Sequence, residues 1–355
     1  MKKKLYIEIY NDLKRKIFDG TYAVGQKLPS KRTLADLYCV STITAEHSLA
    51  MLCDEGYIEA RQRSGYYVIY SDKEFFSSKI GYAKPPEAVL HITVDDSFHF
   101  PAFAKTIRKT LSIWDKAITS KCPNKGCIEL RRELSAYLNR SRGIKVNEGQ
   151  IIIGAGAEYL YGIILQMLGK DRKFAIENPS YEKIEFVYRA NGIEYECLDL
   201  AKDGIKTSEL QKTKASVLHI TPYRSYPSLI SASATKKREY LNWVTGNNRY
   251  LIEDDAESEF TTMHKPEETL FSLDKTGHTI YLNTFSKTIF PSIRTAYMVL
   301  PDELLETYES RVGFYSCTVA LFEQYVISEY IKNGDFERHI NRIRRQKRKN
   351  YNKNT

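Results

Sequence analysis

Two short apolar runs that lead into ionisable side chains constrain how the second half of this chain can fold. One run leads into the carboxylates of 253–255. The other, 279–282, leads into a hydroxyl-rich segment with Lys287 and, seven residues later, Arg294. Apolar runs of this length are typical of buried strands. Each run taken alone is readily explained as an ordinary strand with a polar end, so the order in which they occur carries the information.

The segment around Lys287 has the composition that pyridoxal phosphate (PLP) requires. A lysine can form a Schiff base with the PLP aldehyde, while hydroxyl groups and a cation bind the phosphate. A carboxylate from the first run can keep the pyridine nitrogen protonated. Together, and in this order, the two motifs favour a PLP site over two unrelated strands.

From about residue 96 onward, helical patterns alternate with short apolar strands such as 150–153 and 217–222. This alternation predicts an α/β fold with a mostly parallel sheet and crossover helices. Between the strand 150–153 and a helix over 159–168 lie small residues, Gly154 to Glu158. Backbone amides at such a helix start can approach an anion, which makes this loop a candidate phosphate cradle.

The N-terminal residues predict three helices followed by a hairpin. A helix over 5–18 is followed by two more, with Ser30 and Ser41 as their N-caps, and then by strands over 57–61 and 66–70. This is the pattern of a winged helix, whose third helix enters the major groove of DNA. The alternative is a small packing domain without a DNA-binding role.

These motifs resemble the MocR/GabR-type subfamily of GntR transcription regulators, which join a winged helix to a fold-type I aminotransferase-like domain. The resemblance rests on Lys-Leu-Pro-Ser-Lys-Arg at 27–32, on residues 52–58 and on the segment 284–294. It implies a GntR-type DNA-binding domain in residues 1–70, a linker in 71–95 and an aminotransferase-like PLP-binding domain in 96–355.

The resemblance also implies the roles of individual residues. Lys287 is expected to be the catalytic, Schiff-base lysine, Asp254 to pair with the pyridine nitrogen, and Arg294 to bind the phosphate. The other expected cofactor-binding residues are Ser286, Thr288, Gly156, Ala157, Glu158, Tyr181 and Ser225. The expected DNA-binding residues are Arg32, Ser41, Thr42, Thr44 and Gly65.

The chain departs from the family pattern at several positions. Ala256 replaces a tyrosine, and Arg224-Ser225 replaces a His-Gln pair, so two hydrogen-bond partners of the cofactor are lost. Thr42 replaces an arginine, the residue type that reads guanine best. The resemblance ends at Thr355, where family members continue, so it implies the lack of a C-terminal subdomain that supplies the arginine for a substrate carboxylate.

The net charge of +9 does not by itself indicate nucleic-acid binding, because the last 18 residues carry eight Lys and Arg residues and no acid. No apolar run is long enough to span a membrane, and the N-terminus lacks the apolar core of a signal peptide. The scattered cysteines predict no metal site. These observations predict a cytoplasmic protein.

The sequence therefore predicts a transcription regulator that binds a double-stranded DNA operator, holds PLP and senses a small amine or amino-acid effector. A homodimer is expected, because such regulators bind two half-sites. Two alternatives stay open: a working PLP-dependent aminotransferase, which the altered pocket disfavours, and a DNA-binding protein that no longer holds PLP.

Overall fold

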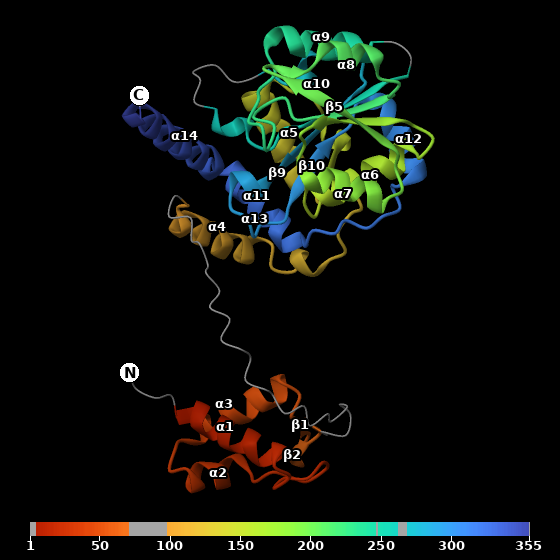
Figure 1. The fold of residues 1–355 in the computed structure, drawn as a ribbon. Helices are drawn as coiled ribbons and strands as arrows, with labels where there is room; N and C mark the ends of the chain where they lie inside the picture. The colour runs from red at the N-terminus through yellow and green to blue at the C-terminus, as the bar shows by residue number, and fades with distance from the viewer. Residues whose placement is uncertain (1–4, 71–97, 246–247, 262–267, 355) are drawn as a thin grey trace. The chain divides into compact units, whose positions relative to one another are not determined.

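The computed structural model describes residues 5–70, 98–245, 248–261 and 268–354 (Figure 1). The chain forms two compact units, one on each side of residues 71–97. The predicted linker 71–95 therefore lies outside the described residues. Each unit has a hydrophobic core of its own.

The N-terminal unit is a winged helix, as predicted. Leu13, Leu34 and Leu49, one from each helix, are fully buried at its centre. The two strands pair in antiparallel register from Ile58 opposite Val68 to Arg61 opposite Gly65. The elements are α1 (Leu5–Phe18), α2 (Lys31–Leu37), α3 (Thr42–Asp54), β1 (Ile58–Arg61) and β2 (Gly65–Val68).

Local signals in the sequence set the helix ends of this unit. The Ser30 hydroxyl accepts a hydrogen bond from the Thr33 N–H at 3.2 Å, and the Ser41 hydroxyl accepts one from the Thr44 N–H at 3.2 Å. Both predicted N-caps are thus confirmed. Gly56 follows α3 with φ +76°, a conformation that favours glycine and ends the helix.

Within the described residues, the large unit is built on an eight-stranded, mostly parallel sheet, which confirms the predicted fold class. The strand β10 is antiparallel to both of its neighbours, β3 and β9, and the edge strand β6 is antiparallel to β5. The other pairings are parallel. In spatial order the strands are β3 (Ile151–Gly154), β10 (Ala296–Val299), β9 (Thr279–Thr284), β8 (Tyr250–Asp254), β7 (Val217–Ile220), β4 (Phe174–Asn178), β5 (Tyr195–Ala201) and β6 (Gly204–Ile205).

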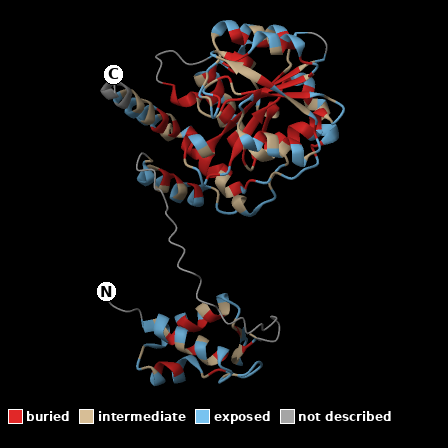
Figure 2. Cartoon of the chain, in the orientation of Figure 1, coloured by how far each residue is buried: buried red, intermediate tan, exposed pale blue. Residues whose placement is uncertain are grey.

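Helices cover both faces of this sheet, so the strands β3, β7, β8 and β9 are buried on both sides (Figure 2). Successive residues of β9 pack on opposite faces of the sheet. Ile280 and Leu282 pack with α6 and α7, whereas Tyr281 packs with α5 and α13. The helices are α4 (Phe100–Ile113), α5 (Ile128–Arg142), α6 (Ala157–Leu168), α7 (Glu182–Ala190), α8 (Thr207–Lys212), α9 (Ala234–Val244), α10 (Leu270–Leu273), α11 (Phe285–Thr288), α12 (Leu305–Arg311), α13 (Leu321–Lys332) and α14 (Asp335–Asn354). Short 3-10 turns lie at Ala117–Thr119, Glu148–Gln150, Ser258–Phe260 and Asp302–Leu304.

The described residues contain neither a membrane-spanning helix nor a cluster of metal-ligating side chains. Among them, no helix combines the length and the apolar character needed to cross a bilayer. Nor does that part of the chain gather three or more His, Cys, Asp or Glu side chains in a way that could hold a metal ion.

A buried ion pair ties helix α5 to the sheet. The Arg142 guanidinium, at the end of α5, donates to the Asp255 carboxylate just after β8, and the two side chains are only 3% and 4% exposed. The Tyr281 hydroxyl on β9 donates to the same carboxylate at 2.8 Å. Charges buried this deeply require partners, so the pair links α5, β8 and β9.

We expect Arg142→Met to lower the free energy of unfolding of the large unit by about 3–5 kcal/mol, because it leaves the Asp255 charge buried without its cation. Both tryptophans, Trp114 and Trp243, belong to this unit, so tryptophan fluorescence in a urea titration reports its unfolding. The control is Arg140→Met, which breaks an exposed pair with Glu337 and should cost about 0–1 kcal/mol. Equal losses in both variants would contradict this role.

Candidate functional site

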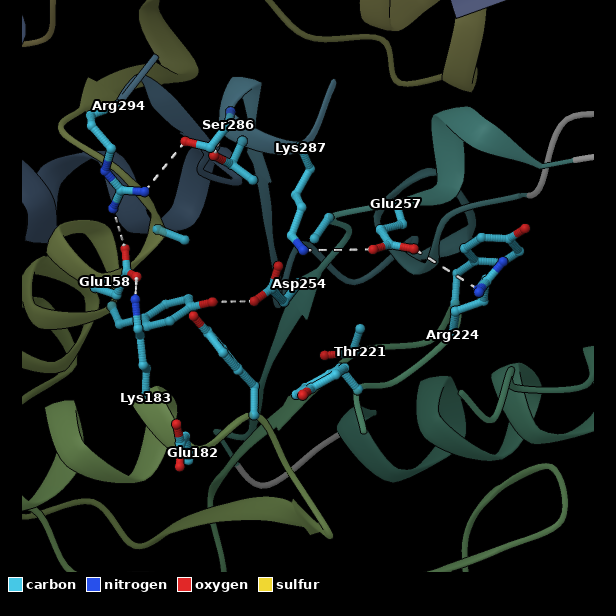
Figure 3. Close-up of a pocket in the computed structure, with 17 residues that line it drawn as sticks. Glu158, Glu182, Lys183, Thr221, Arg224, Asp254, Glu257, Ser286, Lys287 and Arg294 are labelled. Atoms are coloured by element: carbon cyan, nitrogen blue, oxygen red, sulfur yellow. Dashed lines mark hydrogen bonds and ion pairs between the residues drawn. The ribbon is translucent and has the colours of Figure 1, made fainter. Parts of the chain in front are cut away.

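A cavity of about 460 Å³ opens where the parallel strands β7, β8 and β9 end (Figure 3). Ligands of open α/β sheets bind at this edge. The cavity is lined by residues from the strand ends, from the starts of α6 and α7, and from α11. They are Ala157, Glu158, Tyr161, Tyr181, Glu182, Lys183, Thr221, Tyr223, Arg224, Tyr226, Asp254, Ala256, Glu257, Thr284, Ser286, Lys287 and Arg294.

Successive side chains of a strand point to opposite sides, so only one of the three carboxylates at 253–255 lines this cavity. Asp254 lines it, whereas Asp255 pairs with Arg142. The Glu253 carboxylate accepts the backbone N–H groups of Leu270 and Phe271, each at 2.8 Å. Asp254 is therefore the carboxylate of this strand end that can meet a ligand.

Two aromatic neighbours hold the Asp254 carboxylate. The Tyr161 hydroxyl on α6 donates a hydrogen bond to its Oδ2. Burial and the adjacent Asp254 charge hold the pKa of Tyr161 well above its usual value, so this hydroxyl keeps its proton. The His219 ring, on β7, places its Nε2 3.9 Å from the same Oδ2.

Lys287 reaches into the cavity from α11. Its side chain is 59% exposed, and its Nζ lies 3.8 Å from Oε1 of Glu257. The second oxygen of Glu257 lies 3.9 Å from Nε of Arg224. A single carboxylate thus pairs with two cations on this side of the cavity (Figure 3).

On the opposite side, the N-terminus of α6 forms an anion seat with Arg294 and Lys183. The Arg294 Nη2 donates to Oε2 of Glu158 at 2.8 Å, and the Lys183 Nζ donates to Oε1 of Glu158 at 2.9 Å. A second guanidinium nitrogen of Arg294 lies 3.4 Å from the Ser286 hydroxyl. Gly156 precedes the helix with φ +95°, and a Cβ there would lie 2.5 Å from the Arg294 Nη2.

Partial burial alone would raise the pKa of Glu158. The hydrogen bonds from Lys183, from the glutamate's own backbone N–H and from Arg294 outweigh burial, and the pKa is lowered. The carboxylate in the anion seat is therefore charged at neutral pH.

The structure brings most of the expected cofactor-binding residues together. Those that line the cavity are Lys287, Asp254, Arg294, Ser286, Ala157, Glu158 and Tyr181, and Gly156 lies directly behind Arg294 and Glu158. Besides Gly156, two expected residues, Thr288 and Ser225, do not line it. The Thr288 hydroxyl is buried and donates to the Thr284 carbonyl at 3.3 Å, as expected for a residue one turn along α11.

Ser225 is the second expected residue that does not line the cavity. Its hydroxyl is buried and donates to the Glu177 carboxylate at 2.5 Å. Burial raises the pKa of Glu177 to about 7, although the hydrogen bonds from Ser225 and from the Thr221 N–H oppose it. The preceding Arg224 has φ +52° and lines the cavity instead. Ala256 also lines it, and contributes no hydroxyl.

Sequence reasoning missed Tyr161, Lys183 and Glu257. Tyr161 lies one helical turn after Ala157. Residues with this spacing share one face of a helix, so Tyr161 could have been assigned to the cavity together with Ala157. Lys183 and Glu257 follow expected site residues by two and three positions. Their spacing carried no signal, because loop and helix-start side chains point in directions that only the tertiary structure determines.

The expected DNA-binding residues lie in the winged helix. Arg32 on α2, and Ser41 and Thr42 at the start of α3, are exposed, and Thr44 is half-buried. The hydroxyls of Ser41 and Thr44 lie 2.8 Å apart in the helix cap. Gly65 begins β2 with φ +121°.

Two family models match this chain. Residues 5–68 match the bacterial regulatory proteins of the gntR family, and residues 96–353 match aminotransferase class I and II. The second match covers well over half of the chain.

Individual relatives agree with this division. The chain is 30% identical to the uncharacterized HTH-type transcriptional regulator YdeL of Bacillus subtilis, over 97% of this chain and 77% of that protein. It is 24% identical to the probable rhizopine catabolism regulatory protein MocR of Rhizobium meliloti, over 96% of this chain and 74% of that one. The kynurenine aminotransferase of Pyrococcus horikoshii superposes with a TM-score of 0.64 at 22% identity, over 70% of this chain but less than two thirds, 64%, of its own. This likeness shows the fold.

We expect Gly156→Ala to lower the free energy of unfolding of the large unit by about 1–3 kcal/mol, because the backbone conformation and the Arg294 side chain both exclude a Cβ. Gly162→Ala is the matched control in the interior of the same helix. Its Cβ would meet nothing closer than 3.9 Å, and it should be neutral or stabilise by up to about 1 kcal/mol. Urea titrations followed by tryptophan fluorescence measure both, and a smaller loss for Gly156→Ala than for the control would contradict the close approach.

Proposed function

Because the chain belongs to the GntR-type transcription regulators that carry an aminotransferase class I and II domain, we propose that it binds an operator through its winged helix and holds PLP in the cavity of its large unit. PLP lets the large unit sense a small amine or amino acid. The observation that carries this proposal is the convergence of Asp254, Lys287 and Arg294 on one cavity at the start of α6.

The side chains of the cavity fit PLP in their chemistry. Arg294 and the backbone N–H groups at the start of α6 would bind the phosphate, joined by Ser286 once its hydroxyl turns away from the Ile293 carbonyl, and Gly156 keeps a Cβ out of the space beside Arg294. Asp254 would accept a hydrogen bond from the protonated pyridine nitrogen, and its Oδ1 is the oxygen that Tyr161 leaves for it. Tyr181 would cover the ring.

When bound, PLP supplies an aldehyde that condenses with amines, with loss of water, and an electron-withdrawing ring. The chain positions the reacting amine. The Glu257 carboxylate lies 3.8 Å from the Lys287 ammonium and stabilises its charge. An effector amine would compete with Lys287 for the aldehyde carbon of PLP. This competition would shift the equilibrium between two conformational states of the regulator.

Two positions weaken this site relative to a catalytic aminotransferase. Ala256 has no hydroxyl, and Ser225 donates to Glu177 rather than to a ligand. Two missing neutral hydrogen bonds reduce affinity by about 1 kcal/mol each. This favours sensing over catalysis.

On the DNA side, the exposed N-terminal turn of α3 would enter the major groove, with Arg32 on a phosphate or base and the β1–β2 hairpin beside it. Recognition of two half-sites would require a homodimer. Thr42 offers a hydroxyl where an arginine would read guanine, so the operator would differ from guanine-centred sites.

We expect wild-type protein mixed with PLP to develop a visible absorption band, and Lys287→Ala to lack it. Borohydride reduction should fix the cofactor on the peptide that contains Lys287, which gains the mass of PLP less one water plus two hydrogens. Lys206→Ala, which breaks a pair with Asp199 away from the cavity, is the control and should behave as wild type. A wild-type protein without the band would support the cofactor-free alternative, and amino-group transfer to a keto acid would support the aminotransferase alternative.

For DNA binding, we expect Arg32→Ala to weaken binding to sequences selected from a random library with the full chain. If Arg32 contacts a phosphate, the slope of log affinity against log salt falls by about one. Arg15→Ala, on α1, removes the same charge and should leave affinity within twofold of wild type. Equal losses in both variants would mean that only net charge matters.

A further inference from the structure

The anion seat at the start of α6 contains an anion that belongs to the chain itself. The Glu158 carboxylate receives hydrogen bonds from Arg294 and Lys183, at 2.8 and 2.9 Å, and from its own backbone N–H. These donors, two cations and a helix N-terminus, are the partners that a phosphate monoester would use. The chain thus satisfies its own phosphate-binding groups.

The carboxylate and a phosphate cannot share this seat. The Arg294 guanidinium and the Glu158 carboxylate lie so close to Gly156 that a Cβ there would be 2.5 Å from the first and 3.2 Å from the second. Two anions at contact distance repel each other, and Arg294 and Lys183 cannot donate the same N–H groups to both. A phosphate that takes these N–H groups must therefore displace Glu158.

We propose that Glu158 is an internal competitor for the phosphate of the ligand: its carboxylate fills the seat until a phosphate monoester displaces it. The inference rests on the proposed function for the identity of the ligand, but the competition concerns the phosphate alone. It makes ligand binding an exchange of one anion for another. Occupancy of the cavity then varies with the concentration of the phosphorylated ligand.

Displacement also changes the surroundings of α7. Lys183 lies in the first turn of this helix, next to Tyr181, and its ammonium is paired with Glu158 only while the seat is filled by the carboxylate. When phosphate takes the seat, Lys183 and Arg294 exchange partners and the released carboxylate turns to solvent. The exchange gives the large unit two distinct charge arrangements, one for the empty and one for the filled cavity.

The test uses the full chain and two probes that cannot bond covalently to Lys287, pyridoxine 5′-phosphate and pyridoxine. Isothermal titration should show that Glu158→Gln binds pyridoxine 5′-phosphate about tenfold more tightly than wild type, while affinity for pyridoxine stays the same. Adding Arg294→Ala to Glu158→Gln should abolish the gain. The charge-matched control is Glu185→Gln on α7, which breaks a pair with Arg189 and should have no effect.

Equal or weaker binding of pyridoxine 5′-phosphate by Glu158→Gln would overturn the proposal. An equal gain in affinity for both probes would also overturn it, because the effect would then not concern the phosphate. The same holds if neither the wild type nor the variant binds pyridoxine 5′-phosphate. The proposed function fails separately: a tenfold gain in Glu158→Gln without any covalent PLP at Lys287 would leave a competing glutamate in a cavity that does not carry PLP on lysine.

Discussion

The alternation of side chains along β8 is the constraint on which the rest of the large unit depends. Its end carries three adjacent acids, and each needs a different partner because a buried charge without one is costly. Asp255 finds Arg142 from α5, Glu253 finds the backbone N–H groups that begin α10, and Asp254 faces the cavity. The alternation that directs Glu253 and Asp255 toward their partners in the core therefore also directs Asp254 into the cavity.

Most of the architecture could be predicted from local signals. Ser30 and Ser41 cap helices through hydrogen bonds to residues three positions away, and apolar runs reveal buried strands wherever they lie. The order of the two motifs and the family resemblance assign Asp254 and Lys287 to one site, and the parallel strands β8 and β9 end at the same edge of the sheet.

The remaining site residues depend on information that the sequence does not carry locally. The direction of Ser225 follows from the left-handed backbone of Arg224 and from Glu177 on a different strand. Lys183 and Glu257 reach the cavity only because their elements are oriented by tertiary packing. Glu158 was expected at the phosphate cradle, but its pairing with two cations comes from segments distant in sequence.

Four cations of the cavity are paired with carboxylates before any ligand arrives. Glu158 pairs with Arg294 and Lys183, and Glu257 pairs with Lys287 and Arg224. These pairs are partly exposed, so salt screens them and each bond is individually weak. A ligand with both a phosphate and a group that reacts with amines would rearrange both pairs at once.

The connection between β9 and β10 carries both Lys287 and Arg294 on one continuous segment. Because these strands are antiparallel neighbours, residues 285–295 form a closed loop, with hydrogen bonds from the Phe285 N–H to the Thr295 carbonyl at 2.9 Å and from the Ser286 hydroxyl to the Ile293 carbonyl at 2.5 Å. Lys287 and Arg294 both lie on this loop. The distance between the lysine and the arginine is therefore set within this one segment, so a change in another wall of the cavity, such as alanine at position 256, leaves the two cations in place.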